Sequence, residues 1–328
     1  MDEDKFENFI LDKYAISKQQ INTANISFCY LYQDDAHYLD DLLSTFQQDL
    51  ELLSLNLIQA VEFSNFFECL KNPQSFPSNL KEIFINCQQL EYGQSKSNFF
   101  ENFSFIFERL PQLEYLDLNF TSSYTSGILT FLNALKNSRL QKFVLDLYKG
   151  KLNETPSQIM NTIFQSQYLK YLDINFRSLY KNNRMAANNS TDCLEVFQNL
   201  HKCTNLEILK VSLKNNDIEN LQLITFADHL SKTPTNLSQV NLDLTNDYKQ
   251  KRLSQEYINH LEFQILQIPN LTHASISFTE TNAEKHSQRL KQYSQQAKAL
   301  IQQNIAFKKL IGPFMVFNPT FISQDLFF

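Results

Sequence analysis

The 328-residue chain has no tryptophan, only four glycines and no apolar run approaching 18 residues. So few glycines leave little room for a Gly-rich phosphate-binding loop, which needs several residues at positive φ. The missing apolar run argues against a membrane-spanning helix. The acidic start, Met1 to Glu7, has neither the cationic lead and apolar stretch of a signal peptide nor the arginine-rich character of a transit peptide.

Closely spaced cysteine pairs are also absent, although the chain has five cysteines. This usage fits a reducing compartment and predicts a cytoplasmic location. The sequence contains no Gly-x-Ser-x-Gly, Walker or His-Glu-x-x-His pattern. Cys193, His201 and Cys203 are spaced unlike the ligands of a structural zinc site, so each cysteine is better interpreted as a small buried side chain. We therefore expect no catalytic, cofactor or metal site and no small-molecule substrate.

What the chain does have is an internal repeat. The segment Leu-Glu-Tyr-Leu-Asp-Leu-Asn-Phe at 113–120 recurs at 169–176 as Leu-Lys-Tyr-Leu-Asp-Ile-Asn-Phe. The segment starting at Leu140 lies between the copies with the same apolar spacing, so the period is near 28 residues rather than 56. Self-similarity at such a period is typical of a solenoid, in which each unit stacks on its neighbours.

Nine segments match this template, and each predicts a short strand. They start at residues 21, 50, 80, 113, 140, 169, 206, 237 and 271. Helical periodicity separates several of them and predicts helices over 99–110, 128–135, 156–164 and 191–200. Thr155 followed by Pro156 predicts the cap and first turn of the third of these helices. The longest interval contains a polar, aperiodic stretch, 181–190, which we expect to be a loop insertion.

The strand-plus-helix unit resembles the leucine-rich repeat, specifically the ribonuclease-inhibitor-like subclass. The resemblance covers about 21–280 and implies an α/β solenoid of about nine repeats, with a parallel concave sheet and convex helices. Segment 1–20 would then be an N-terminal cap, and 281–328 a C-terminal helix and Phe-rich tail. One departure lies at the ninth template position, where the family has Asn or Cys and this chain has Thr121, Tyr148, Arg177, Lys214 and Thr245. Other groups must then bind the turn amides.

Residues between the buried positions of each strand would face the concave surface, because side chains alternate along a strand. One such column contains Asp146, and the next contains Asp117, Asp173 and Lys210. Tyr115 and Tyr171 stand two repeats apart in a third column. Aromatic residues beside carboxylates suit a basic peptide or an arginine-bearing protein surface. The alternative is a sheet face that is polar simply to remain soluble.

The two ends of the chain differ in charge, and the overall formal charge is −6. Residues 1–60 carry a net −8, and residues 281–310 a net +5. A helix predicted over 283–303, with Lys285, Arg289, Lys291 and Lys298, could dock RNA or simply be a solvated cap. The final Leu326, Phe327 and Phe328 follow several other phenylalanines, which either close the last repeat or contact a partner.

The sequence thus favours a non-enzymatic protein-binding scaffold, or a structural subunit of a larger complex. Its candidate contacts are Tyr115, Asp117, Asp146, Tyr171 and Asp173 on the sheet and the three terminal residues. The alternative is an RNA- or ribosome-associated accessory protein that docks through the basic helix. The Asn/Gln/Lys-rich composition resembles that of proteins from AT-rich protist genomes. Divergent family members there populate cytoskeletal and ciliary complexes, an analogy that concerns setting alone.

Overall fold

A computed structural model describes most of the predicted repeat array. The described residues are 22–29, 50–58, 77–88, 100, 103–125, 127–152, 154–179, 193, 195–216, 218–232, 236–245, 253–278 and 314–315. The predicted N-terminal cap segment, loop insertion and basic helix lie outside these ranges. So does the rest of the C-terminal tail, including Leu326, Phe327 and Phe328.

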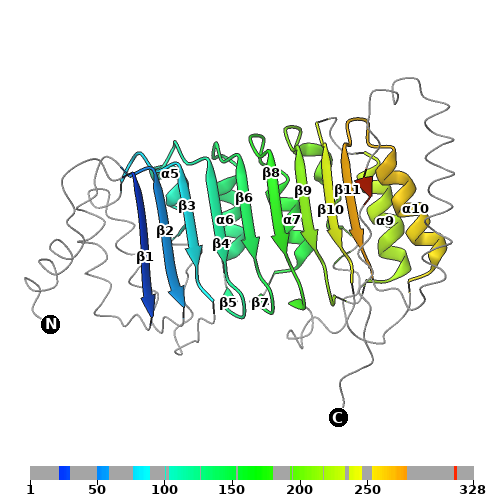
Figure 1. Cartoon of the computed structure of the whole chain (residues 1–328), viewed down its shortest axis with the longest axis horizontal. Helices are drawn as coiled ribbons and strands as arrows, with labels where there is room; N and C mark the ends of the chain where they lie inside the picture. The colour runs from blue at the N-terminus through cyan, green and yellow to red at the C-terminus, as the bar shows by residue number, and fades with distance from the viewer. Residues whose placement is uncertain are drawn as a thin grey trace, which may run out of the picture.

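A single sheet of ten strands, paired throughout in parallel, organises the described residues. Figure 1 shows the strands side by side in chain order. They are β1 (Thr23–Cys29), β2 (Leu52–Ile58), β3 (Glu82–Asn86), β4 (Tyr115–Asn119), β6 (Lys142–Asp146), β8 (Tyr171–Asn175), β9 (Ile208–Ser212), β10 (Gln239–Asp243), β11 (His273–Ser277) and β12 (Phe314–Met315). The prediction of an α/β fold built on a parallel sheet is confirmed.

Each of the first nine strands begins two residues after its predicted start, and a repeated backbone irregularity explains this offset. The carbonyl of Glu114 accepts hydrogen bonds from the amides of both Gln141 and Lys142, each at 2.9 Å. One residue is thereby added ahead of the regular ladder, much as at a β-bulge. Leu113 and Leu116 can then both be buried, although an odd spacing would place them on opposite faces of a regular strand. The same double acceptance occurs at the carbonyls of residues 22, 51, 81, 141, 170, 207 and 238.

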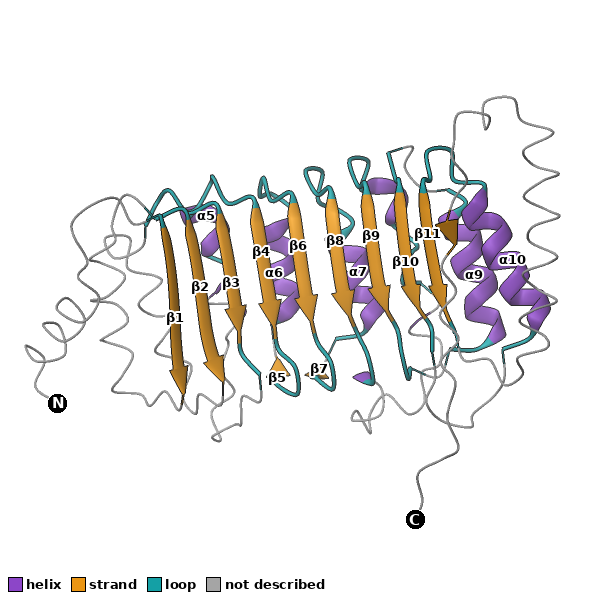
Figure 2. Cartoon of the chain, in the orientation of Figure 1, coloured by secondary structure: helices purple, strands orange, loops and turns teal. Residues whose placement is uncertain are grey.

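The helices form a second layer on one side of the sheet, where Figure 2 shows α5, α6 and α7 behind the strands and α9 and α10 toward the C-terminal end. Their bounds are α5 (Ile106–Arg109), α6 (Ile128–Leu135), α7 (Pro156–Ile163), α9 (Asn220–Leu230) and α10 (Gln255–Leu266). The core lies between the two layers. Phe131 of α6, for example, packs its ring within 6.3 Å, centroid to centroid, of Phe100, Phe103, Phe107 and Phe143.

Two of the predicted helices match closely. α6 has the predicted bounds, and α7 ends one residue earlier than expected. Thr155 caps α7 as predicted: its hydroxyl accepts from the amide of Gln158 at 3.2 Å, and the Gln158 side chain accepts from the Thr155 amide at 2.9 Å. This reciprocal pair satisfies two amides that a helix start leaves unbonded.

Of the other two predicted helices, the one through Leu200 is wrong and the one over 99–110 is interrupted. Over residues 195–202 the backbone forms turns and a short 3-10 helix, η4 (Leu200–Lys202), instead of an α-helix through Leu200. The buried residues Phe197, Leu200 and Cys203 lie three apart, which matches the three-residue turn of a 3-10 helix, although the buried Cys193, Val196, Phe197 and Leu200 also fit an α-helix. In the 99–110 segment the prediction is met in part: Phe100 and Phe103 are helical, a turn follows at 104–105, and α5 then ends before Pro111 as expected.

A repeated turn follows the strands and supplies the amide acceptors that the ninth template position lacks. At the end of a strand, a side-chain oxygen accepts from the backbone amide two residues later, as in an Asx-turn. The bonds run from Thr121 to Asn119 (3.0 Å), Tyr148 to Asp146 (2.8 Å), Arg177 to Asn175 (3.0 Å) and Thr245 to Asp243 (3.1 Å). The residue after the bonded amide is left-handed at Ser122, Lys149 and Ser178, and Asn215 is left-handed at the equivalent position after β9. The expectation that other groups bind the turn amides is confirmed at these four bonded positions.

Three strands were not predicted. β5 (Tyr124–Thr125) and β7 (Lys151–Leu152) pair in parallel as a separate two-stranded sheet, beyond the lower ends of β4 and β6 in Figure 1. β12 pairs in parallel with β11, placing the backbone of Phe314 and Met315 beside His273 and Ala274. Part of the C-terminal segment therefore covers the last strand of the repeat array.

Candidate binding surface

The face of the sheet opposite the helices, here called the open face, carries the candidate residues. Three columns of side chains run across it, and the strand register confirms the alignment predicted for each. The first contains Tyr115, Lys142, Tyr171 and Ile208; the second Phe84, Asp117, Val144, Asp173, Lys210 and Asn241; and the third Asn119, Asp146, Asn175, Ser212 and Asp243. Nearly all of them are half-buried, while their neighbours along each strand are in the core.

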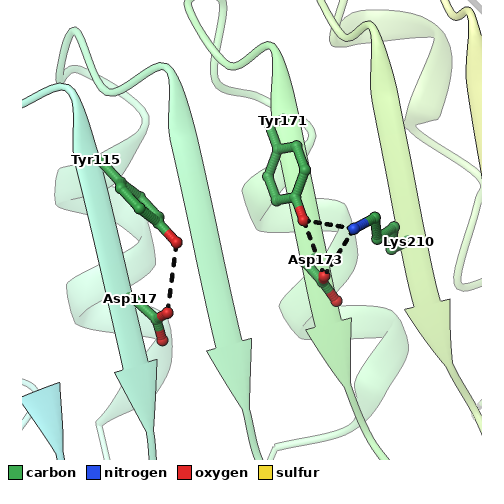
Figure 3. A network of polar contacts seen from close by, with 5 residues as sticks. All are labelled: Tyr115, Asp117, Tyr171, Asp173 and Lys210. Carbon is green, nitrogen blue, oxygen red and sulfur yellow. Dashed lines mark hydrogen bonds and ion pairs between the residues drawn. The ribbon is translucent and has the colours of Figure 1, made fainter. Parts of the chain in front are cut away.

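Tyr171, Asp173 and Lys210 form a closed polar cluster between β8 and β9 (Figure 3). The Tyr171 hydroxyl donates to Asp173 Oδ2 at 3.1 Å and accepts from Lys210 Nζ at 2.8 Å. Lys210 Nζ also lies 3.6 Å from Asp173 Oδ2 and 5.0 Å from the centre of the Tyr171 ring. The ammonium group thus has a hydrogen bond, an ion pair and a cation–π contact within one repeat junction.

Tyr115 and Asp117 repeat the first half of this cluster on β4, as Figure 3 also shows. The Tyr115 hydroxyl lies 3.5 Å from Asp117 Oδ2 and donates to it. Phe84 packs edge-to-face against the Tyr115 ring, with centroids 4.9 Å apart, and Lys142 Nζ stands 5.8 Å from that ring. On the neighbouring strand β6, the residue beside Asp117 is Val144. The equivalent residue beside Asp173 is Lys210 of β9.

The electrostatics of the two pairs differ accordingly. Burial raises the pKa of Asp117; hydrogen bonding from Tyr115 opposes this rise, and the charges of Asp173 and Asp146 add to it. Burial, reinforced by the charge of Asp117, raises the pKa of Tyr115 to about 12. Burial also raises the pKa of Tyr171, but there Lys210 acts in the opposite direction. The hydrogen bond to Tyr171 raises the pKa of Lys210, so its ammonium is well stabilised.

Asp146 occupies a different position from the other two aspartates. It lies in the third column, and its Oδ1 accepts the Tyr148 amide in the turn after β6. Its charge still influences Asp117, as the raised pKa of that carboxyl indicates. The three aspartates thus share one electrostatic field, while only Asp117 and Asp173 pair with a tyrosine hydroxyl.

The cysteine and histidine candidates lie away from this surface. Cys193 and Cys203 are both buried, as predicted. The Cys203 thiol donates to the carbonyl of Ser166 at 3.3 Å, and burial raises its pKa to about 12. His201 Nδ1 contacts the Gln198 carbonyl at 3.2 Å. Within the described ranges no group of three or more His, Cys, Asp or Glu side chains is arranged to hold a metal ion.

Lys210 is the member of the polar cluster for which the sequence predicts a column but no role. Its register position next to Asp173 was available from the template alignment and is the signal that could have identified the cluster.

The models of known protein families yield no match to this chain, and no curated protein is significantly similar to it. In the part of the chain that the structure describes, no helix is long and apolar enough to cross a membrane.

Proposed function

We propose that this chain is a divergent leucine-rich-repeat solenoid that binds another protein through the open face of its sheet, as a non-enzymatic subunit of a larger assembly. The support for the repeat type is the Leu-x-x-Leu-x-Leu template together with a parallel ladder in which one unit adds one strand. Solenoids of this kind offer an extended surface on which many residues contact a partner at once.

The observation that carries the proposal is the pair of tyrosines on the open face. Tyr115 and Tyr171 are only partly buried, and each is held by an aspartate two residues further along its strand. Tyrosines that are held in place and partly exposed are frequent binding hot spots, because they bury a large area with little loss of conformational entropy. Phe84 and Lys142 extend the same surface around Tyr115.

A binding role fits these groups better than catalysis. With its pKa raised to about 12, the Tyr115 phenol stays protonated at neutral pH and serves as a donor rather than a base. The Tyr171 hydroxyl is already engaged on both sides, by Asp173 and Lys210. The contacts of the cluster therefore fix the positions of the Tyr171 ring, the Asp173 carboxylate and the Lys210 ammonium group.

The proposal is tested by native affinity purification and mass spectrometry on two matched variants. Tyr115→Ala/Tyr171→Ala truncates two large side chains on the open face. Leu221→Ala/Phe263→Ala truncates two on the helices, where these side chains are 60% and 43% exposed. We expect a protein partner to be recovered with the wild type and the helix variant and lost with the open-face variant.

Two outcomes would contradict the proposal. Loss of the partner in the helix variant alone would move the contact to the opposite layer. Loss of every partner after nuclease treatment would instead favour RNA docking, the alternative that rests on the basic segment outside the described residues.

We extend the proposal to a cytoplasmic assembly of cytoskeletal or ciliary type. Its support is the composition, which resembles that of proteins from AT-rich protist genomes, where divergent members of the repeat family populate such complexes. A fluorescent fusion that stays diffuse in ciliated cells under all conditions would contradict this setting without affecting the binding surface.

A further inference from the structure

The two tyrosine–aspartate pairs are copies of one motif with different surroundings. They arise from the two nearly identical segments, 113–120 and 169–176, and their hydroxyl-to-carboxylate distances are 3.5 and 3.1 Å. At one copy the following strand supplies Lys210, and at the other it supplies Val144. Figure 3 shows Lys210 at the Tyr171–Asp173 copy, and no lysine or arginine of the described ranges bonds to Asp117 at the other copy.

The filled copy shows how an ammonium group is held there. Lys210 Nζ is fixed by the hydroxyl and the ring of Tyr171 and by the carboxylate of Asp173, at the distances given above. All three contacts come from groups that the Tyr115–Asp117 copy also has. A tyrosine ring, its hydroxyl and a carboxylate together match a primary ammonium ion in both charge and geometry.

The Tyr115–Asp117 copy has the same hydroxyl, ring and carboxylate, but the residue beside Asp117 on the next strand, Val144, supplies no ammonium group to it. Among the described residues, no lysine or arginine forms an ion pair with Asp117. Lys142 is exposed and reaches only the ring of Tyr115, at 5.8 Å. Asp117 is partly withdrawn from water while facing the charges of Asp146 and Asp173, an arrangement that a cation relieves. Val144 provides an apolar wall against which the methylene stem of a lysine can lie.

We propose that Tyr115, Asp117 and Val144 form a binding site for a lysine side chain of the partner protein, in the place that Lys210 fills at the equivalent site. This inference rests on the proposed function and specifies the partner's chemistry: it presents a basic segment to the open face. Charge complementarity is the basis of the assignment, since no described lysine or arginine forms an ion pair with Asp117.

The test uses the full-length chain and an acetylated, amidated hexalysine peptide as the probe, titrated calorimetrically at low ionic strength. Val144→Lys gives the Asp117 site its own ammonium group, and we expect peptide affinity at that site to fall about tenfold. Asn25→Lys on β1 adds the same charge to an exposed position of the second column and is the matched control. Asp117→Asn, which keeps the side-chain shape, should weaken binding by a similar factor.

The reciprocal change should create a site. Lys210→Val empties the Tyr171–Asp173 copy, and we expect one further hexalysine site per chain. The inference would be overturned if the Val144→Lys and Asn25→Lys variants bound hexalysine with equal affinity. It would also be overturned if Lys210→Val had the same number of hexalysine sites as the wild type. The same peptide with acetylated lysine side chains should not bind at either copy; if it binds equally well, the ammonium group is not what is recognised.

The outcomes separate this inference from the proposed function. The open-face variant could lose the protein partner while Val144→Lys leaves hexalysine affinity unchanged. That result would support the open face as the binding surface and would contradict the lysine site. The lysine site would stand and the scaffold proposal would fall if hexalysine followed these predictions while no protein partner depended on Tyr115 and Tyr171.

Discussion

The strands β4 and β8 are nearly identical in sequence and differ in what surrounds them. Toward the helices they are equivalent: Leu116 and Leu118 on one, Leu172 and Ile174 on the other, all fully buried. Toward the open face, Lys210 neutralises the tyrosine–aspartate pair of β8, whereas no lysine or arginine of the described ranges forms an ion pair with the aspartate of β4. The comparison indicates that packing constrains the inner face of a repeat, while the outer face depends on what the next strand contributes.

The inner face should give the largest effect, and an equal one in both strands. Leu116→Ala and Leu172→Ala each leave a cavity between the sheet and the helices. We expect each to lower the free energy of unfolding by ~2–5 kcal/mol. Urea denaturation measures the change. A loss under half of that range in one strand only would mean that the two repeats are not packed equivalently.

The turns after the two strands should give a smaller effect, again equal in both. Asn119→Ala and Asn175→Ala remove the oxygens that accept the amides of Thr121 and Arg177, each at 3.0 Å. We expect a loss of about 1 kcal/mol in each case, since the amide is left without its acceptor. Thermal unfolding of both variants provides the measurement, and no change in either would show that water replaces the side chain.

The aspartates on the open face should give the smallest effects, and these should be opposite in sign. Asp173→Asn removes the ion pair with Lys210 and should destabilise the fold by less than about 1 kcal/mol, because the pair is partly exposed. Asp117 has a raised pKa, so the folded state favours its protonated form and loses stability as the pH rises through that pKa. Asp117→Asn removes this penalty and should stabilise the fold slightly at pH 7.

The pH dependence distinguishes this account from a simple change of polarity. The advantage of Asp117→Asn over the wild type should disappear when the pH falls low enough to protonate Asp117 in both folded and unfolded states. A variant less stable than the wild type at pH 7 would contradict the interpretation of Asp117 as an unneutralised carboxylate. Unfolding measured at several pH values gives the result.

Much of the fold could be predicted from the sequence because the repeat fixes the inner face. The apolar residues at template positions 1, 4 and 6 located all nine strands with one constant offset, and the columns of the open face followed from them. The offset itself could not be predicted, because it depends on a backbone carbonyl that accepts two amides and has no side-chain signature.

The remaining features depend on contacts between units rather than on the pattern within one. The left-handed turn residues Ser122 and Lys149 are neither glycine nor asparagine, so composition gives no signal for them. The 3-10 winding near Leu200 follows from a buried spacing that also suits an α-helix. The role of Lys210 depends on its contacts with Tyr171 and Asp173; the template alignment places these residues side by side but does not give the side-chain geometry.

The central claim is that the tyrosine–aspartate motif forms a site for an ammonium group. One residue of the next strand, lysine or valine, decides whether that site is filled within the chain or available to a partner. Exchanging the two residues, Val144→Lys with Lys210→Val, tests it most directly. We predict that hexalysine binding then moves from one copy to the other. In this exchanged background Asp173→Asn should weaken binding about tenfold and Asp117→Asn should leave it unchanged, the reverse of the wild type. Binding that stays sensitive to Asp117 in both backgrounds would contradict the account.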